Sequence, residues 1–154
     1  MNTKVMFSSN SNEWTTPDDL YQILDSEFHF TLDAASTDEN AKCPRHFTAE
    51  DNGLEQNWGG ASVFCNPPYG KEIGLWVRKA YEESRKSDTK VVLLIPARTD
   101  TRYFHDYILG KASEIRLIRG RVHFGDGTSP APFPSMIVVY DTEHIETRFI
   151  TQEI

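Results

Sequence analysis

The chain has 154 residues, of which 38% are hydrophobic, and carries a formal net charge of −7 with two cysteines. This length and apolar content predict one globular domain with a single core, and no apolar run approaches the roughly 20 residues of a membrane span. Two cysteines without paired Cys or His neighbours exclude a disulfide framework and argue against a metal site. Because the first residues lack a secretion-signal pattern, we expect a cytoplasmic protein with no membrane partner.

Charge is unevenly distributed along the chain. Residues 1–75 hold four Lys or Arg against twelve Asp or Glu, residues 76–121 hold eleven against six, and residues 122–154 hold one against five. An acidic first half beside a basic centre fits a protein that holds a cationic cofactor at one place and meets phosphates at another. A solvated, charged helix face explains the basic residues of 78–86 equally well.

The first third of the chain begins with a polar stretch, so we expect a flexible arm at 1–12 and a single domain at 13–154. Thr16 and Pro17 have the types preferred at an N-cap and a first helical position, and apolar residues follow at helical spacing. This pattern predicts a helix at about 17–27. Residues 28–34 then alternate like a strand that ends near Asp33.

The rest of the chain alternates between strand and helix patterns. The apolar run at 90–96 has the composition of a parallel strand that is buried on both faces. The other expected elements are short strands at 45–48 and 63–65, helices at 71–86 and 101–109, and strands at 114–118 and 135–141. Such alternation predicts an open, mostly parallel α/β sheet flanked by helices, with ligands bound beyond the carboxyl ends of its strands.

Residues 66–70 read Asn-Pro-Pro-Tyr-Gly and directly follow the strand expected at 63–65. Pro67 pushes Asn66 out of the helical region, so the Asn66 side chain and the Pro67 carbonyl can converge on one planar amino group. Tyr69 adds a surface for stacking a base, which is worth roughly 1 to 3 kcal/mol. The motif resembles motif IV of the amino-methyltransferases that use S-adenosylmethionine; the alternative is a proline-stiffened turn.

Polar residues follow several of the expected strands. Asp33, Asp51, Asn66 and the segment 96–98 would therefore lie along one edge of the sheet. Acidic residues there suit a ligand that carries a sulfonium, an α-ammonium, ribose hydroxyls and an adenine amino group. Taken alone, each Asp could equally cap a helix or form a turn.

Six motifs in a fixed order carry a more specific resemblance. They are Glu-Trp-Thr-Thr-Pro at 13–17, Leu-Asp-Ala-Ala-Ser at 32–36, Glu-Asp-Asn-Gly-Leu at 50–54, Asn-Pro-Pro-Tyr-Gly at 66–70, Pro-Ala-Arg-Thr-Asp-Thr at 96–101 and Gly-Arg-Val-His-Phe at 120–124. The chain from about 13 to 141 resembles the phage-type Dam family of DNA N6-adenine methyltransferases. The resemblance implies a compact, Rossmann-like class I methyltransferase fold. It also implies methyl transfer from S-adenosylmethionine to a flipped-out adenine of double-stranded DNA, by a monomer or weak homodimer.

The resemblance assigns residues to the cofactor, although no glycine follows Asp33 until Gly53, where this fold commonly has a glycine-rich turn. It implies that Asp33 and Ala34 hold the methionine end, that Asp51 holds the adenine end and that Asn66 also faces the cofactor. Asp38 is a candidate for the ribose by position. By analogy, Trp14, Thr15 and Pro17 close over the cofactor, unless they form only an N-terminal staple and cap.

The substrate side is assigned in the same way. The catalytic residues implied are Asn66, Pro67 and Tyr69, with a second aromatic wall from Phe124 or Phe133 unless these are ordinary core. Arg98, Arg102 and Arg121 are candidates for phosphate or guanine contacts, although Arg121 could equally be structural. A planar amine in RNA or a glutamine amide in a protein would fit the same pocket. A catalytically silent nucleic-acid-binding protein is the other alternative.

Overall fold

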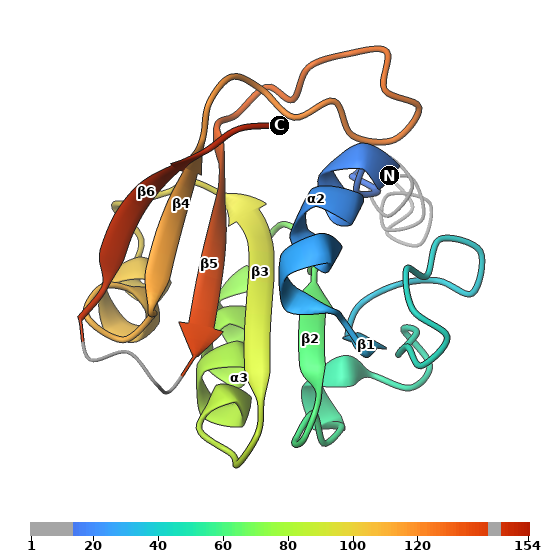
Figure 1. The fold of residues 1–154 in the computed structure, drawn as a ribbon, viewed down its shortest axis with the longest axis vertical. Coiled ribbons are helices and arrows are strands. Elements are labelled where there is room, and N and C mark those ends of the chain that lie inside the picture. Colours follow the sequence, from blue (N-terminus) through green and yellow to red (C-terminus); the bar gives the residue numbers. More distant parts are fainter. Residues whose placement is uncertain (1–13, 142–145) are drawn as a thin grey trace.

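A six-stranded sheet forms the centre of the computed structural model, which describes residues 14–141 and 146–154 (Figure 1). The strands lie in the order β1, β2, β3, β5, β4, β6. Their bounds are β1 Leu32–Asp33, β2 Ser62–Cys65, β3 Lys90–Pro96, β4 Glu114–Ile118, β5 Ser135–Asp141 and β6 Arg148–Gln152. Strand β1 is parallel to β2, β2 to β3 and β4 to β6, whereas β5 is antiparallel to both neighbours. The chain is therefore an α/β protein with a mostly parallel sheet.

Two helices, α2 Asp18–Phe28 and α3 Ile73–Ser84, cover opposite faces of this sheet (Figure 1). Successive residues of a strand point to opposite faces, and β3 shows this directly. Val91, Leu93 and Ile95 join the core cluster of α3, whereas Val92 and Leu94 join the cluster of α2. All five side chains are fully buried, so the expectation of a strand buried on both faces is confirmed.

Most of the elements predicted from the sequence are present. The strands at 90–96, 114–118 and 135–141 have the predicted bounds, and β2 begins one residue earlier than expected. The helices at 17–27 and 71–86 are confirmed as α2 and α3, each displaced or shortened by a few residues. The arm expected at 1–12 lies outside the described residues.

Three predictions differ from the structure in whole or in part, and one strand was not predicted. The strand expected at 28–34 is reduced to β1, because α2 extends to Phe28 and His29 has a left-handed conformation with φ 50°. The strand expected at 45–48 is a single bridge between His46 and Asp33. The helix expected at 101–109 is present from residue 102 to residue 108, but most of it, Phe104–Ile108, has π-helical geometry. Strand β6 was not predicted, because as an edge strand it is half exposed and lacks a clear apolar pattern.

The loop after β1 folds back onto the end of that strand. Asp33 donates its backbone N–H to Arg45 O (3.1 Å), and its carbonyl accepts from Phe47 N (3.0 Å). Ser36 N in turn donates to Phe47 O (3.0 Å). These bonds pair backbone groups that the two-residue strand β1 would otherwise leave unsatisfied.

Gly53 closes this loop. A Cβ on Gly53 would overlap the Ala34 carbonyl oxygen and would also lie 3.0 Å from the Trp76 ring. The Gly53 carbonyl accepts a hydrogen bond from the Trp58 indole N–H (2.9 Å), and Trp58 is fully buried. The missing glycine-rich turn is thus replaced by one glycine twenty residues after β1, which brings the far end of the loop against Ala34.

We expect Gly53→Ala to lower the free energy of unfolding by about 1 to 3 kcal/mol, because the added Cβ would force the backbone at Ala34 to shift. Chemical denaturation measures this loss. The control is Gly74→Ala in α3, where a Cβ would meet only Tyr103 at an ordinary 3.7 Å. Equal stability of the two variants would contradict the proposed packing.

Candidate functional site

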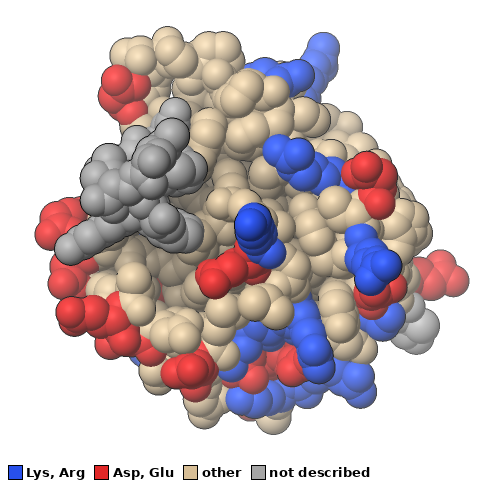
Figure 2. Space-filling model, turned by 180° about the vertical axis from the view of Figure 1, so that it is seen from behind, with Lys and Arg blue, Asp and Glu red and all other residues tan. Residues whose placement is uncertain are grey.

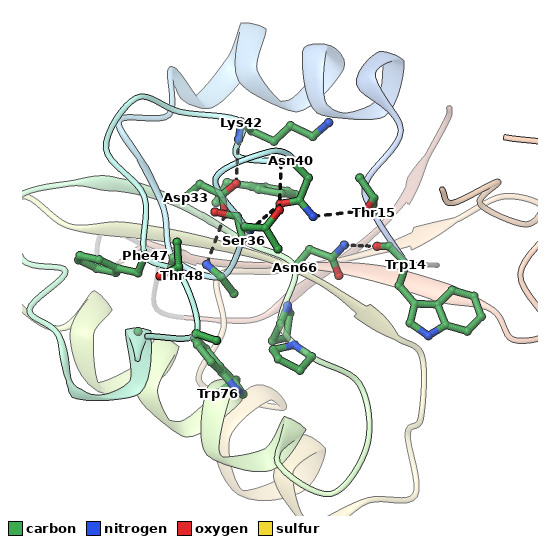
Figure 3. A pocket seen from close by; sticks show the side chains of 18 of the residues that line it. Trp14, Thr15, Asp33, Ser36, Asn40, Lys42, Phe47, Thr48, Asn66 and Trp76 are labelled. Atoms are coloured by element: carbon green, nitrogen blue, oxygen red, sulfur yellow. Dashed lines mark hydrogen bonds between the residues drawn. The ribbon is translucent and has the colours of Figure 1, made fainter. Parts of the chain in front are cut away.

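A cavity of about 780 Å³ opens at the carboxyl ends of β1 and β2. Three parts of the chain form most of its wall: residues 14–16, the loop from Asp33 to Leu54 and the turn at 66–69 (Figure 3). The position agrees with the rule that ligands of α/β sheets bind beyond the strand ends. The volume lies within the range of small-molecule sites.

Asp33 lies at the end of β1 and is only 2% exposed. Its carboxylate accepts hydrogen bonds from the backbone N–H groups of Lys42 (2.9 Å) and Ala35 (3.3 Å). Burial raises the pKa of Asp33 to about 6, although these two hydrogen bonds act in the opposite direction. A cationic group bound in the cavity would favour the ionised carboxylate and lower this pKa again.

The loop between Asp33 and Gly53 carries further polar residues of the wall. Thr37 and Asn40 cap each other, since each backbone N–H donates to the other's side-chain oxygen (2.7 and 3.1 Å). The exposed Asp38 lines the cavity, as its candidacy for the ribose requires, but its carboxylate is bonded to His46 Nε2 at 2.8 Å. This hydrogen bond raises the pKa of His46.

Asp51 occupies a different position from the one expected of an adenine ligand. It is exposed and is absent from the cavity wall, which its neighbours Glu50 and Asn52 do line. Its carboxylate accepts hydrogen bonds from the backbone N–H and the hydroxyl of Thr48 (2.9 and 3.2 Å). Asp51 therefore stabilises a turn of the loop, which is the alternative that its residue type left open.

The Asn66 amide has a defined orientation. Its Nδ2 donates to the Trp14 carbonyl oxygen (2.6 Å) and to Thr16 Oγ1 (3.0 Å). Its Oδ1 is buried in the cavity wall and has no hydrogen-bond partner among the described residues. Figure 3 shows the nitrogen turned toward Trp14 and the oxygen turned away from it. A buried acceptor without a partner costs about 1 to 3 kcal/mol, and a ligand that donates to Oδ1 would remove this cost.

Thr16 was expected to cap the following helix, but the structure gives it another partner. Helix α2 begins at Asp18, Pro17 occupies the cap position and no side chain caps the helix. The Thr16 hydroxyl instead accepts from Asn66. Thr15 lines the cavity, whereas Pro17 lines only a shallow neighbouring hollow.

Four aromatic rings cluster beside the Asn66 turn. Tyr69 stacks on Trp14 with 6.2 Å between ring centroids, and its ring meets Phe133 and Phe124 edge-on at 5.8 and 6.2 Å. The Tyr69 hydroxyl donates to the Leu94 carbonyl (3.0 Å). The structure thus brings together the three rings that were expected to flank a base, and it adds Trp14, which was expected at the cofactor.

Two more polar atoms of the cavity wall have no hydrogen-bond partner in the described part of the chain. They are Ser36 Oγ and Trp76 Nε1, both buried. Trp76 was not predicted as a site residue, because its helical spacing is that of an ordinary core residue, and its ring does stack on that of Trp58. Ser36 belongs to the motif at 32–36 but was not predicted to have a role of its own. With Asn66 Oδ1, they offer a ligand one acceptor, one donor and one hydroxyl.

The basic residues expected at a nucleic acid lie outside the cavity wall. Arg98, Arg102 and Arg121 are exposed. Arg121 Nη1 donates to the Ala131 carbonyl (3.2 Å) and so links the beginning and the end of the loop between β4 and β5. Figure 2 shows the face behind that of Figure 1, where Lys and Arg alternate with Asp and Glu. On α3, Arg78 pairs with Glu82 (2.6 Å), and both side chains are exposed, as on a solvated helix face. Lys86, just beyond α3, pairs with the buried Glu83 (2.7 Å).

Residues 14–141 and 146–154 contain neither a membrane-spanning helix nor a metal-binding cluster. None of their helices is long and apolar enough to cross a membrane. They also contain no cluster of three His, Cys, Asp or Glu side chains that could hold a metal ion. Cys43 and Cys65 are free and buried, and burial raises the pKa of both thiols.

Comparison with known proteins yields one family and two relatives. The model of the family "DNA N-6-adenine-methyltransferase (Dam)" matches residues 3–152. The DNA N-6-adenine-methyltransferase of Escherichia phage T1 is 32% identical over 93 residues, which are 59% of this chain and 38% of the phage protein. The protein YfdM of Escherichia coli strain K12 is 37% identical over 65 residues, 38% of this chain and 71% of YfdM. Because the family model matches nearly the whole chain, this protein belongs to the Dam family of DNA N-6-adenine-methyltransferases.

Proposed function

We propose that the chain is a site-specific DNA adenine N6-methyltransferase that uses S-adenosylmethionine. The observation that carries the proposal is the Asn66 amide, whose nitrogen is bound by the protein while its oxygen is left as a buried acceptor in the cavity wall. Family membership supports it, and so does the name of the phage T1 relative, of which the matched region covers only 38%. The sheet order, with β5 antiparallel between β3 and β4, supports a compact Rossmann-like class I methyltransferase fold.

The cavity residues fit S-adenosylmethionine. Asp33 would face its cationic methionine end beside Ala34 and Thr15, because a buried carboxylate is stabilised by a nearby positive charge. The unpartnered Ser36 hydroxyl and Trp76 indole N–H would bond its acceptor atoms. When bound, the cofactor supplies an electrophilic methyl group.

The acceptor amine would lie against Asn66. Its two N–H groups would donate to Asn66 Oδ1 and to the Pro67 carbonyl, which directs the nitrogen lone pair toward the methyl group. The two oxygens would also stabilise the positive charge that develops on nitrogen. The aromatic cluster around Tyr69 would offset part of the cost of rotating the base out of the duplex. Arg98, Arg102 and Arg121 remain proposed contacts to phosphates or base edges.

The decisive experiment is transfer of labelled methyl groups from S-adenosylmethionine to unmethylated DNA, followed by digestion to nucleosides and mass analysis. The proposal expects N6-methyladenine. Label found only in RNA or on protein glutamine would be compatible with the proposed pocket but would show that the substrate is not DNA. No label in any of these, with no heat of cofactor binding in calorimetry, would identify a silent binding protein.

We expect Asn66→Ala to lower kcat by about a hundredfold or more, because it removes the acceptor that polarises the amine. The cofactor Kd should stay nearly constant, since the amide acts on the other substrate. Single-turnover kinetics and calorimetry measure the two quantities. Asn57→Ala, at an exposed asparagine outside the cavity wall, should change neither. Equal losses of kcat and cofactor affinity would remove Asn66 from the catalytic role.

We expect cofactor affinity to depend on the ionisation of Asp33. The pKa of Asp33 in the empty protein is raised to about 6, so below that pH a proton must leave before a cation binds. Affinity should therefore rise by up to about tenfold per pH unit as the pH increases toward 6, and should be level above it.

Calorimetry between pH 5 and 8 measures this dependence. His46, whose pKa is raised by Asp38, titrates in the same direction, so the readout is the difference between the wild type and Asp33→Asn. Asp106→Asn removes the same charge from an exposed turn outside the cavity wall and should keep the wild-type profile. An unchanged profile in Asp33→Asn would place the cation elsewhere.

A further inference from the structure

The contact between residues 14–16 and Asn66 restricts which side chain can stand at position 66. The Trp14 carbonyl oxygen, 2.6 Å from Asn66 Nδ2, has no proton to give, so the atom that faces it must be a donor. Thr16, which is 4% exposed, places its hydroxyl oxygen 3.0 Å from the same nitrogen. Together the two acceptors hold the amide in one of its two orientations, with the nitrogen toward the protein.

We propose that Thr16 is a positioning residue for methyl transfer, and that the Trp14 carbonyl makes asparagine, rather than aspartate, necessary at position 66. The inference rests on the proposed function, because it concerns how the acceptor oxygen of Asn66 is presented. With both amide protons directed at Trp14 and Thr16, Oδ1 points away from that segment and has no partner among the described residues, so it is available to accept from a bound amine. Such preorganisation spares the reaction the cost of turning the amide.

Independent contacts hold the segment that supplies the two acceptors. The Trp14 ring packs on Phe133 at 5.1 Å and on Phe124 at 5.6 Å. On the other side, the Thr15 carbonyl accepts a hydrogen bond from Gly125 N (3.0 Å), and Pro17 leads directly into α2. The Thr16 hydroxyl has no capping role in that helix. The segment therefore has a fixed position against which the amide is oriented.

An aspartate at position 66 would lose this orientation. Its ionised carboxylate would place an oxygen against the Trp14 carbonyl oxygen, where Nδ2 now lies at 2.6 Å. Only the protonated acid has an O–H that can donate there and leave the second oxygen free to accept. The N66D variant should thus recover activity as the pH falls. If position 66 needed only an acceptor, the ionised carboxylate would serve and activity would not recover at low pH.

The first test compares three threonine variants at saturating cofactor. Thr16→Val keeps the shape but removes one of two acceptors, so kcat should fall about tenfold with the cofactor Kd unchanged. Thr16→Ser should restore kcat. Thr89→Val is the control, because Thr89 is equally buried and its hydroxyl accepts from Gly60 N (2.8 Å) outside the cavity wall. Wild-type kcat in Thr16→Val, or equal loss of kcat and cofactor affinity, would overturn the proposal.

The second test is the pH profile of N66D, which also decides the matter if Thr16→Val fails to fold. Its kcat relative to wild type should rise on acidification from pH 8 to pH 5.5, with cofactor saturating at each pH. A ratio that stays constant would overturn the requirement for a donor at this position.

A third measurement separates this inference from the proposed function. In the wild-type protein, the side-chain amide protons of Asn66 should exchange with solvent more slowly in NMR than those of the exposed Asn57. Thr16→Ser should keep that protection and Thr16→Val should reduce it. These results require no methyl transfer, so a protein that methylates no DNA would refute the function and still report the amide orientation. Equal exchange at Asn66 and Asn57 would refute the orientation.

Discussion

The cavity depends on the return of the loop after β1 to the end of that strand. Gly53 permits this return, because no side chain fits between its Cα and the Ala34 carbonyl oxygen. The indole of Trp58 holds the Gly53 carbonyl from the other side. Backbone bonds from Asp33 to residues 45 and 47 then supply the pairing that β1, with only two residues, lacks. One wall of the cavity is thus a loop, and the close packing of Gly53 against the Ala34 carbonyl helps to hold this loop in place.

The same loop gives the cavity its electrostatic character. By covering Asp33, it keeps water away from a carboxylate whose pKa is raised to about 6. Asn66 Oδ1 lies in the same wall, so two acceptors without full compensation face one space. A cation would compensate the Asp33 carboxylate, and the N–H of an amine would compensate Asn66 Oδ1. A sulfonium methyl donor and an amine acceptor would supply these two groups. The exposed arginines lie outside this wall, so the proposed phosphate contacts and the proposed cofactor contacts would occupy different surfaces.

Sequence reasoning succeeded where a local pattern determines the structure. The apolar run at 90–96 has the length and composition of a buried strand and forms β3, and the turn at 66–70 directly follows β2 as expected. It failed where contacts between residues far apart in the sequence determine the structure. The left-handed His29 shortens β1, and pairing with β4 forms β6 from residues with little apolar pattern. Within the site, Asp33 and Asn66 were placed correctly at the strand ends, but the bond from Asn66 to Thr16 spans 50 residues and leaves no local signal.

That long bond explains why an amide suits this site. An amide has a donor half and an acceptor half, and here the protein uses the donor half while the acceptor half stays in the cavity wall. The carbonyl that takes the donor belongs to Trp14, whose ring also stacks on Tyr69. One residue therefore contacts both the group that would polarise the amine and the ring that would support the base. A displacement of Trp14 by an incoming base would alter the amide as well, so the proposed stacking and polarisation would be coupled through the Trp14 side chain and its own carbonyl.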